Sequence, residues 1–243
     1  MALQRRRGAA LAGLSLVLVA AAAAADGGPP LPAHIPSDAR ARVTPVTEEP
    51  SLSTRVNGAP FVARREVFEF LLDHPEFATH VTRALKLARY RIWRTAEGLA
   101  IDDGWGTTGT FEVVWSANGT RLMYARGEYH PRLLPTIRGR AVVLIDYGVQ
   151  PAPRAPGSLI SAAVTGYVKL DSRVLAGLSR LAGPIARAKA DKEANRLVQL
   201  FARAMHAIES DPAGVYERLY RAPGTPPREL EELRTLLHLP GTP

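Results

Sequence analysis

A two-residue turn signal between two alternating segments constrains most strongly how this chain can fold. Apolar and polar residues alternate through GTTGTFEVVW (106–115) and again through TRLMYARGEY (120–129). Asn118-Gly119 lies between these segments, and this pair is favoured in type I′ turns because both central positions require positive φ. The chain is therefore predicted to contain an antiparallel hairpin.

The register of this hairpin predicts which side chains share a face of the sheet. With Asn118 and Gly119 as the loop, Ala117 lies opposite Thr120, and every second pair outward points to the same side. Those pairs are Trp115 with Leu122, Val113 with Tyr124, Phe111 with Arg126, and Gly109 with Glu128. The predicted face is apolar for most of its length and ends in two charged residues.

The rest of the chain changes its hydrophobic period several times. We predict strands at 51–57, 87–95, 138–150 and 157–170, two short helices within 63–85, and a long helix over 172–210 that Pro184 should kink. The strands at 138–150 and 157–170 are apolar on both faces, so we expect either that other elements cover at least part of both sides or that these strands are central in the sheet.

The segment REVFEFLLDHPEFATHV (65–81) contains acidic and histidine side chains among apolar ones, a mixture found in metal sites and in amphipathic helices. Helical spacing predicts that Val67, Phe70 and Leu71 face the core. It predicts that Glu66, Glu69 and Asp73 face water. Pro75 separates His74 from His80 into different helices, so joint metal ligation by these two is not expected.

The segment VNGAPFVARREVFEFLLDHPEFATHV (56–81), followed by strands and a long helix, resembles the START-like superfamily, also called SRPBCC or polyketide cyclase-related. The resemblance covers about residues 50 to 210, and the chain departs from it by extra residues after Ala59-Pro60 and by His80 where many relatives have Trp. It implies an α+β helix-grip fold, in which an antiparallel sheet wraps around a long carboxy-terminal helix and two short helices follow the first strand.

The resemblance further implies a cavity between the sheet and the long helix for a hydrophobic or lipid-like small molecule. Combined with the hairpin register, it makes the following residues candidates for the cavity lining: Phe111, Val113, Trp115, Leu122, Tyr124, Arg126, Glu128, Phe201 and Met205. Two alternatives stay open: the apolar residues fill a solid core, and Arg126 and Glu128 form an ion pair at the rim. One alternative function is a cyclase or aromatase that uses the same cavity, with Tyr129-His130 and Asp146-Tyr147 as sources of acid and base. Another is an envelope protein that acts through its surface.

The amino-terminal residues predict export. Three arginines precede an apolar run that ends near Ala23 and Ala25, which is the pattern of a secretory signal peptide over 1–25. A retained anchor is the alternative. We expect a proline-rich linker over 26–50, a START-like domain over 51–211, and a carboxy-terminal tail over 212–243 that contains one short helix, RELEELRTLLHL. This tail is expected either to pack on the domain or to hang from it. The expected location is the bacterial periplasm or the medium.

The amino-acid composition limits the classes of partner that we expect for this protein. Residues 1–25 hold three of the 31 basic residues and none of the 23 acidic ones, so their removal lowers the formal net charge from +8 to +5. The arginines are scattered, which does not favour nucleic acid as a partner. With no cysteine and six dispersed histidines, no metal or cofactor is expected. We expect a monomer that makes at most transient contact with a membrane surface.

Overall fold

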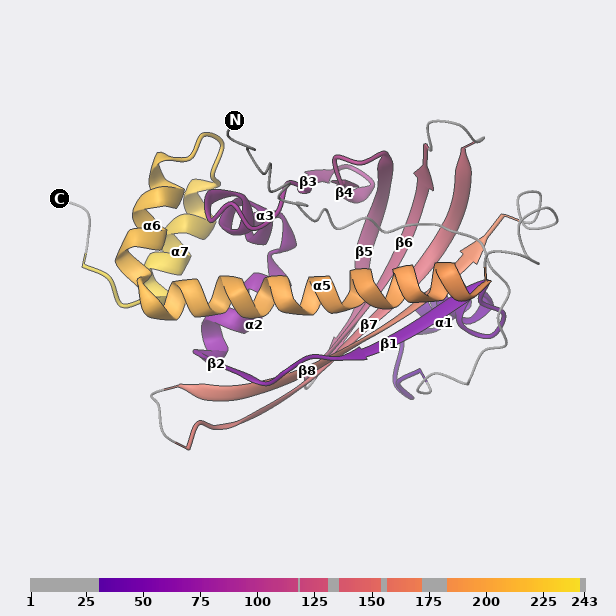
Figure 1. The fold of residues 1–243 in the computed structure, drawn as a ribbon, viewed down its shortest axis with the longest axis horizontal. Helices are drawn as coiled ribbons and strands as arrows, with labels where there is room; N and C mark the ends of the chain where they lie inside the picture. Colours follow the sequence, from indigo (N-terminus) through magenta and orange to yellow (C-terminus); the bar gives the residue numbers. More distant parts are fainter. Residues whose placement is uncertain (1–30, 118, 131–135, 154–156, 172–182, 241–243) are drawn as a thin grey trace, which may run out of the picture.

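The computed structural model describes residues 31–117, 119–130, 136–153, 157–171 and 183–240. The predicted signal peptide and the start of the predicted long helix lie outside these ranges. The elements, in chain order, are α1 (Ser37–Thr47), β1 (Leu52–Asn57), β2 (Phe61–Ala63), α2 (Arg65–Asp73), α3 (Pro75–Ala84), β3 (Arg91–Thr95), β4 (Gly98–Asp102), β5 (Thr107–Ala117), β6 (Thr120–Tyr129), β7 (Ile137–Pro151), β8 (Ser158–Leu170), α5 (Gly183–Ser210), α6 (Pro212–Arg221) and α7 (Pro227–Leu236). Figure 1 shows their arrangement.

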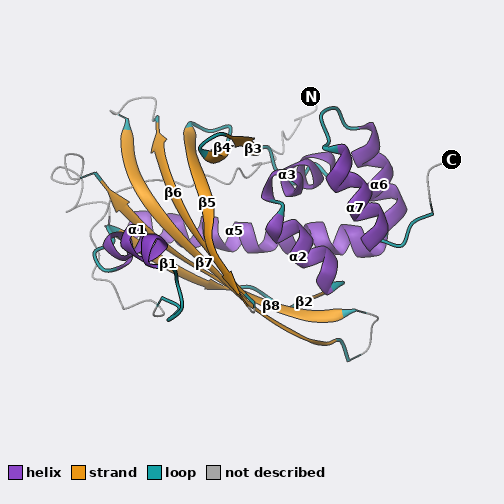
Figure 2. Ribbon diagram, turned by 180° about the vertical axis from the view of Figure 1, so that it is seen from behind, coloured by secondary structure: helices purple, strands orange, loops and turns teal. Residues whose placement is uncertain are grey.

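One antiparallel sheet forms the centre of the protein. The strand order is β1-β8-β7-β6-β5-β4-β3. Strand β2 pairs with the first three residues of β8, next to the part of β8 that pairs with β1. The long strands β7 and β8 are central, and helices cover both of their faces: α5 lies in front of the sheet in Figure 1, and α1 lies on the side seen in Figure 2. The predicted α+β antiparallel fold and the double cover of these two strands are confirmed.

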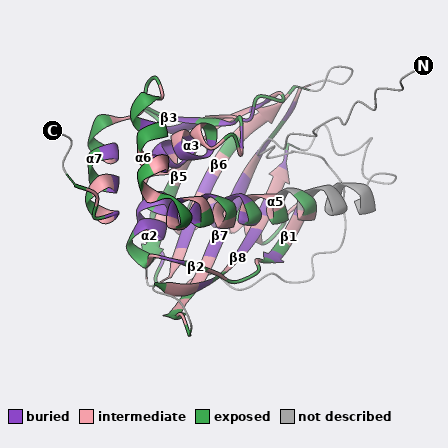
Figure 3. Cartoon of the chain, turned by 60° about the vertical axis from the view of Figure 1, so that its left-hand side comes forward, coloured by how far each residue is buried: buried purple, intermediate pink, exposed green. Residues whose placement is uncertain are grey.

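The α5 side of the sheet holds the larger core. Helix α5 packs against β1, β2 and β8, and α2, α3, α6 and α7 gather around its carboxy-terminal end. The largest fully buried side chains of this core are Phe68, Leu71, Phe77, Ile160, Met205, Ile208, Leu219 and Leu233. Figure 3 shows that buried and half-buried residues run through the middle of the sheet, whereas the outer surfaces of the helices are exposed.

Helix α1 forms a second, smaller core on the opposite face. Its residues Ala39, Val43 and Val46 are buried against β6, β7 and β8. The predicted extended linker is therefore wrong for 37–47. Pro36 precedes the first turn, where a missing N–H has no effect, whereas Pro45 lies inside the helix, in its last turn, and removes one backbone hydrogen bond. The apolar spacing of i, i+4 and i+7 decides the structure instead.

The hairpin register is confirmed near the turn and wrong beyond it. Ala117 pairs with Thr120 and Trp115 with Leu122, but a β-bulge at Val114 shifts the register, and Val113 then pairs with Met123. Because side chains alternate along a strand, this single extra residue turns the remainder of β5 over relative to β6. Phe111 therefore lies opposite Ala125 rather than Arg126.

The carboxy-terminal residues belong to the main core rather than to a separate tail. The predicted short helix is confirmed as α7, but α6 precedes it, and Val215, Leu219, Leu230 and Leu233 are buried in the same core as α2 and α3. Residues 212–240 therefore pack on the domain, which was one of the two expected arrangements, and the core continues past the predicted boundary at residue 211. Gly183 and Pro184 form the start of α5 as described, so the predicted kink falls at the edge of the described residues. None of the described helices has the length and apolar character needed to span a membrane.

Candidate functional site

Three of the side chains predicted to line a cavity lie on the α1 side of the sheet. Leu122 and Tyr124 are buried in the smaller core with Val43 and Val46 of α1, and Trp115 packs against the same cluster. Helix α5 is on the other side of the sheet. These three residues therefore cannot line a space between the sheet and α5.

The other apolar candidates lie on the α5 side, where they do not form one lining. Phe111 packs against a small cluster that includes Leu200 of α5. Val113 is 38% exposed, Met205 is fully buried, and the ring of Phe201 lies edge-on to Phe68 with 6.4 Å between centroids. The β-bulge is the physical reason that the predicted set divides between two faces.

The predicted ion pair between Arg126 and Glu128 does not form. Glu128 is in an ion pair, but with other partners. Its carboxylate accepts a hydrogen bond from Arg138 Nε at 3.0 Å and contacts His130 Nε2 at 3.1 Å. Hydrogen bonding from Arg138, and then from His130, lowers the pKa of the Glu128 carboxyl. Arg126 therefore forms no ion pair with Glu128 and contacts Tyr124 instead.

Arg126 lies in a polar pocket on the α1 side, which we call the arginine–tyrosine pocket. Its volume is about 290 Å³, and it is lined by Arg42, Glu97, Thr110, Phe111, Glu112, Tyr124 and Arg126. The guanidinium groups of Arg42 and Arg126 lie 5.7 and 5.6 Å from the centroid of the Tyr124 ring. Arg42 also forms an ion pair with Glu112 across the pocket.

Arg126 keeps most of its hydrogen-bonding capacity free. Its Nε donates to the Tyr124 hydroxyl oxygen at 3.3 Å, and no described carboxylate lies within ion-pair distance of it. Hydrogen bonding to Tyr124 raises the pKa of Arg126, and the charges of Tyr124 and Glu112 act in the same direction. A guanidinium has five N–H donors in a planar fork, so several can bind a ligand.

Three cations lie side by side on adjacent strands next to this pocket. The sheet register places Arg126 directly opposite Arg140, and Arg140 directly opposite Lys169. Lys169 is compensated, because its Nζ bonds to Glu49 Oε2 at 2.9 Å and to the Pro45 carbonyl at 3.0 Å. Arg126 and Arg140 have no carboxylate partner among the described residues. Like charges in directly opposed positions destabilise a sheet, so an anion bound between them would remove an unfavourable interaction.

The sequence alone indicated only part of this pocket. Tyr124 and Arg126 were found because they alternate along one strand, whereas Arg42 was missed because its segment was interpreted as a linker. Arg140 could be associated with Arg126 only through the pairing of β6 with β7. The one available signal was the repeated arginine of Arg138-Gly139-Arg140 at the start of an otherwise apolar strand.

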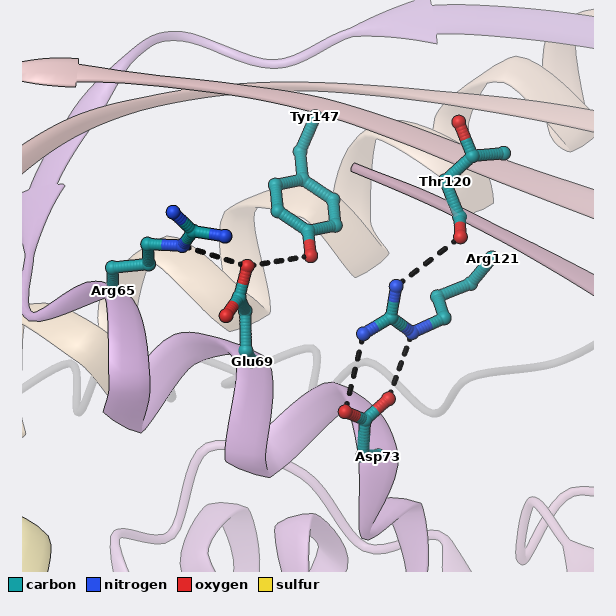
Figure 4. Close-up of polar contacts among 6 residues, drawn as sticks. All are labelled: Arg65, Glu69, Asp73, Thr120, Arg121 and Tyr147. Carbon is teal, nitrogen blue, oxygen red and sulfur yellow. Dashed lines mark hydrogen bonds and ion pairs between the residues drawn. The ribbon is translucent and has the colours of Figure 1, made fainter. Parts of the chain in front are cut away.

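A second polar cluster, the α2 network, lies on the α5 side and is shown in Figure 4. Arg121 donates from Nε and Nη2 to the two Asp73 oxygens at 2.7 and 3.1 Å. The Tyr147 hydroxyl donates to Glu69 Oε1 at 2.9 Å, and Arg65 Nε donates to the same oxygen at 2.9 Å. Helix α2 thus contributes two carboxylates, one turn apart, to residues of β6 and β7.

The prediction that Glu69 and Asp73 face water holds only in part, because Glu69 is half-buried, whereas Asp73 is exposed and still reaches the sheet. Both carboxylates bind the sheet, and only Glu66 of the three acids is exposed without a described partner. Hydrogen bonding to Asp73 raises the pKa of Arg121, and burial together with the bond to Glu69 raises the pKa of Tyr147. The charges compensate one another, so this arrangement attaches α2 to the sheet.

The two acid–base pairs considered for an enzyme do not form one site. Asp146 lies opposite Thr120, the first residue of β6, and accepts a hydrogen bond from its hydroxyl at 3.0 Å. Tyr129 is the last residue of that ten-residue strand. At about 3.4 Å per residue, the pairs lie roughly 30 Å apart. A more open hollow of about 420 Å³ is lined by small residues together with Asn57, Asp146 and Tyr147.

Comparisons with known proteins identify no family. No family model matches the chain, and no curated protein matches it. Among solved structures, the chain is similar to a hypothetical protein from Helicobacter pylori, with 10% sequence identity and a TM-score of 0.36. That similarity covers 64% of this chain and 84% of the other.

Proposed function

We propose that this chain is a non-catalytic binding protein of the bacterial envelope, whose ligand is a small molecule with an anionic group. The ligand would place a carboxylate or phosphate in the arginine–tyrosine pocket. The observation that carries this proposal is the juxtaposition of Arg126 and Arg140 without a carboxylate partner among the described residues. Like charges directly opposite each other destabilise a sheet, and a bound anion would offset that cost.

The lining of the pocket is suited to an anionic group of limited size. Arg126 offers a planar fork of donors, and the Thr110 hydroxyl offers another donor beside it. The volume of about 290 Å³ lies at the lower end of the usual pocket range of roughly 300 to 1,000 Å³. Glu97 and Glu112 add negative charge, which favours a ligand with one or two negative charges over a polyanion.

The location in the envelope rests on the amino-terminal residues. The three arginines and the apolar run of residues 1–25 support export, and the chain lacks cysteine throughout. The proposal narrows the apolar ligand expected from the sequence to one with an acidic group, such as a fatty acid or a phospholipid head group. A monomer would suffice, since the lining residues named above come from one chain.

Binding can be tested by calorimetry on the purified full chain with three probes of different charge: octanoate, inorganic phosphate and octylamine. Octanoate or phosphate should bind with 1:1 stoichiometry, and octylamine should not. Arg126→Gln and Arg140→Gln should each weaken binding at least tenfold. Arg138→Gln is the matched control, because Arg138 already pairs with Glu128, and it should leave binding unchanged. Equal binding by all variants, or no binding of either anion, would refute the proposal.

A second candidate is the carriage of an apolar molecule between the sheet and α5, as in a helix-grip fold. It is supported by the order of elements, a strand, two short helices, an antiparallel meander and a long helix packed on the sheet. The half-buried Phe201 and Tyr147 beside Phe68 supply apolar surface with a polar group next to it. Native mass spectrometry and organic extraction of protein from the periplasm should then recover a stoichiometric apolar compound, and an empty chain would argue against carriage.

A further inference from the structure

Three metal-ligating side chains converge where α2, α3 and α7 meet. One ring nitrogen of His74 and one carboxylate oxygen each of Glu76 and Glu229 lie within 4.8 Å of one another. His74 is the residue between α2 and α3, Glu76 lies in the first turn of α3, and Glu229 lies in the first turn of α7. Residues more than 150 positions apart in the sequence are thus brought together by the packing of α7 against α2.

Local structure explains how the chain presents the first two of these residues. Pro75 ends α2 and begins α3, so His74 adopts a non-helical conformation with φ −121° and ψ 65° between them. The His74 ring packs on Phe70 with 4.7 Å between centroids, which limits its rotation. Ligand side chains held in place by their neighbours bind a metal ion at a lower entropic cost.

Two buried atoms of this cluster have no hydrogen-bond partner. These are Nδ1 of His74 and Oε2 of Glu76. Glu76 is only 9% exposed, and Arg94 occupies its other oxygen, Oε1. An unpaired buried polar atom is rare in folded proteins and calls for an explanation such as an ion. Both unpaired atoms belong to the same cluster of potential metal ligands, so a single bound cation would satisfy both.

The charges of the cluster also favour a cation. Glu76 and Glu229 bring two negative charges into proximity, and Arg94 compensates one of them. No ion pair or hydrogen bond joins His74 to either carboxylate in the described part of the chain. The amino-terminal helix dipoles of α3 and α7 favour the two acids, but they supply no partner to the unpaired atoms.

We propose that His74, Glu76 and Glu229 bind a divalent transition-metal ion, most favourably zinc. Imidazole together with carboxylates suits zinc, whereas magnesium and calcium prefer oxygen ligands alone. At Zn–ligand distances of about 2.0 to 2.2 Å, tetrahedral ligand atoms lie about 3.4 Å apart, so the side chains would close in by small rotations. Three protein ligands leave the fourth position to water.

The ion would act as a clamp between distant parts of the chain. It would connect the α2–α3 junction to α7, the helix that closes the carboxy-terminal end of the core. The clamp is independent of the arginine–tyrosine pocket, because the two sites share no residue. Position along the chain associates His74 with His80, whereas Glu229 comes close to His74 only through tertiary packing.

The test is zinc binding by the full chain, without an affinity tag, after dialysis against a chelator. Calorimetry should show one equivalent of Zn²⁺ bound, and added Zn²⁺ should raise the melting temperature. The His74→Ala and Glu229→Gln variants should bind zinc at least tenfold more weakly and lose the thermal shift. His206→Ala, which removes an exposed histidine of α5, should behave as the parent protein.

A spectroscopic readout separates loss of ligands from loss of folding. Co²⁺ bound in place of zinc should give visible d–d absorption in the parent protein and in His206→Ala, but not in Glu229→Gln. Glu229 is half-buried, so its isosteric replacement should keep the circular dichroism spectrum of the parent. The proposal is overturned if the parent protein binds no zinc, or if Glu229→Gln and His74→Ala bind it with unchanged affinity.

Discussion

Arg121 of β6 and Asp73 of α2 form a two-point ion pair, with 2.7 Å between Nε and Oδ1 and 3.1 Å between Nη2 and Oδ2. The Arg121 side chain is only 10% exposed, whereas the Asp73 side chain is 50% exposed. The cation is therefore the buried partner, and its carboxylate reaches it from the edge of the core. This geometry makes the pair sensitive to the loss of the acid.

We expect Asp73→Asn to destabilise the protein by about 2 kcal/mol. The substitution leaves the buried guanidinium with a neutral partner, and hydrogen bonds to charged groups contribute about 1.5 to 3 kcal/mol. Urea unfolding followed by circular dichroism measures the change. Glu66→Gln, on the exposed face of the same helix, is the control and should shift stability by less than about 0.5 kcal/mol. Equal effects of the two substitutions would show that Asp73 does not hold α2 to the sheet.

Helix α1 gives a second prediction about stability. Val43→Ala should cost about 2 kcal/mol, because Val43 is fully buried against the sheet and loses two carbon groups with partial cavity formation. Ala41→Ser on the exposed side of the same helix should have almost no effect. Both are measured by urea unfolding. A mobile linker over 26–50 would make the two substitutions equally neutral, which is the outcome that would contradict the docked helix.

Much of the fold was predictable from local patterns. The turn at Gly119, the alternation of the strands and the two helices on either side of Pro75 each depend on residues close in sequence. The bulge at Val114 was not predictable in this way, because a valine inside an apolar strand carries no signature of an extra residue. This one residue places Phe111 and Val113 on the opposite face of the sheet from Trp115. The predicted cavity lining is therefore divided between the two faces.

The candidate sites were less predictable because they depend on pairing between distant segments. Arg126 was identified from its own strand, but Arg140 is its neighbour only through the β6–β7 register, and Arg42 arrives on a helix hidden in a proline-rich segment. Glu229 reaches His74 only after α7 has packed. Periodicity shows which face of an element a residue occupies, but it does not show what lies opposite that face.

Removing one of the paired arginines should stabilise the protein while it impairs binding. Arg140→Gln relieves repulsion from Arg126 and Lys169 on the neighbouring strands, and we expect a gain of about 0.5 kcal/mol in the absence of an anion. Urea unfolding in a low-salt buffer without phosphate measures it. Arg138→Gln, which removes an ion pair instead, should show no gain. A loss of stability in Arg140→Gln would mean that this side chain has a structural partner, contrary to the binding proposal.

Alkaline pH should destabilise the protein partly through Tyr90. Burial raises the pKa of Tyr90 from 10.0 to about 12, against a smaller opposing effect of the Thr82 hydrogen bond. Below pH 10 both the folded and the unfolded states hold the proton, so this tyrosine adds no pH dependence. Between pH 10 and 12 the unfolded state releases the proton and the folded state keeps it, so the free energy of unfolding falls as pH rises, by about 2 to 3 kcal/mol in total.

Urea unfolding at intervals from pH 9.5 to 11.5 tests this dependence on Tyr90. Tyr90→Phe keeps the buried ring and removes the ionisable hydroxyl, so its stability should fall less steeply with pH than that of the parent protein. Tyr147 and Tyr167 also have raised pKa values, so some decline should persist in the variant. Tyr220→Phe is the matched control, because Tyr220 is 60% exposed and its loss should leave the slope unchanged. Parallel curves for the parent and Tyr90→Phe would show that Tyr90 ionises equally readily in the folded and unfolded states.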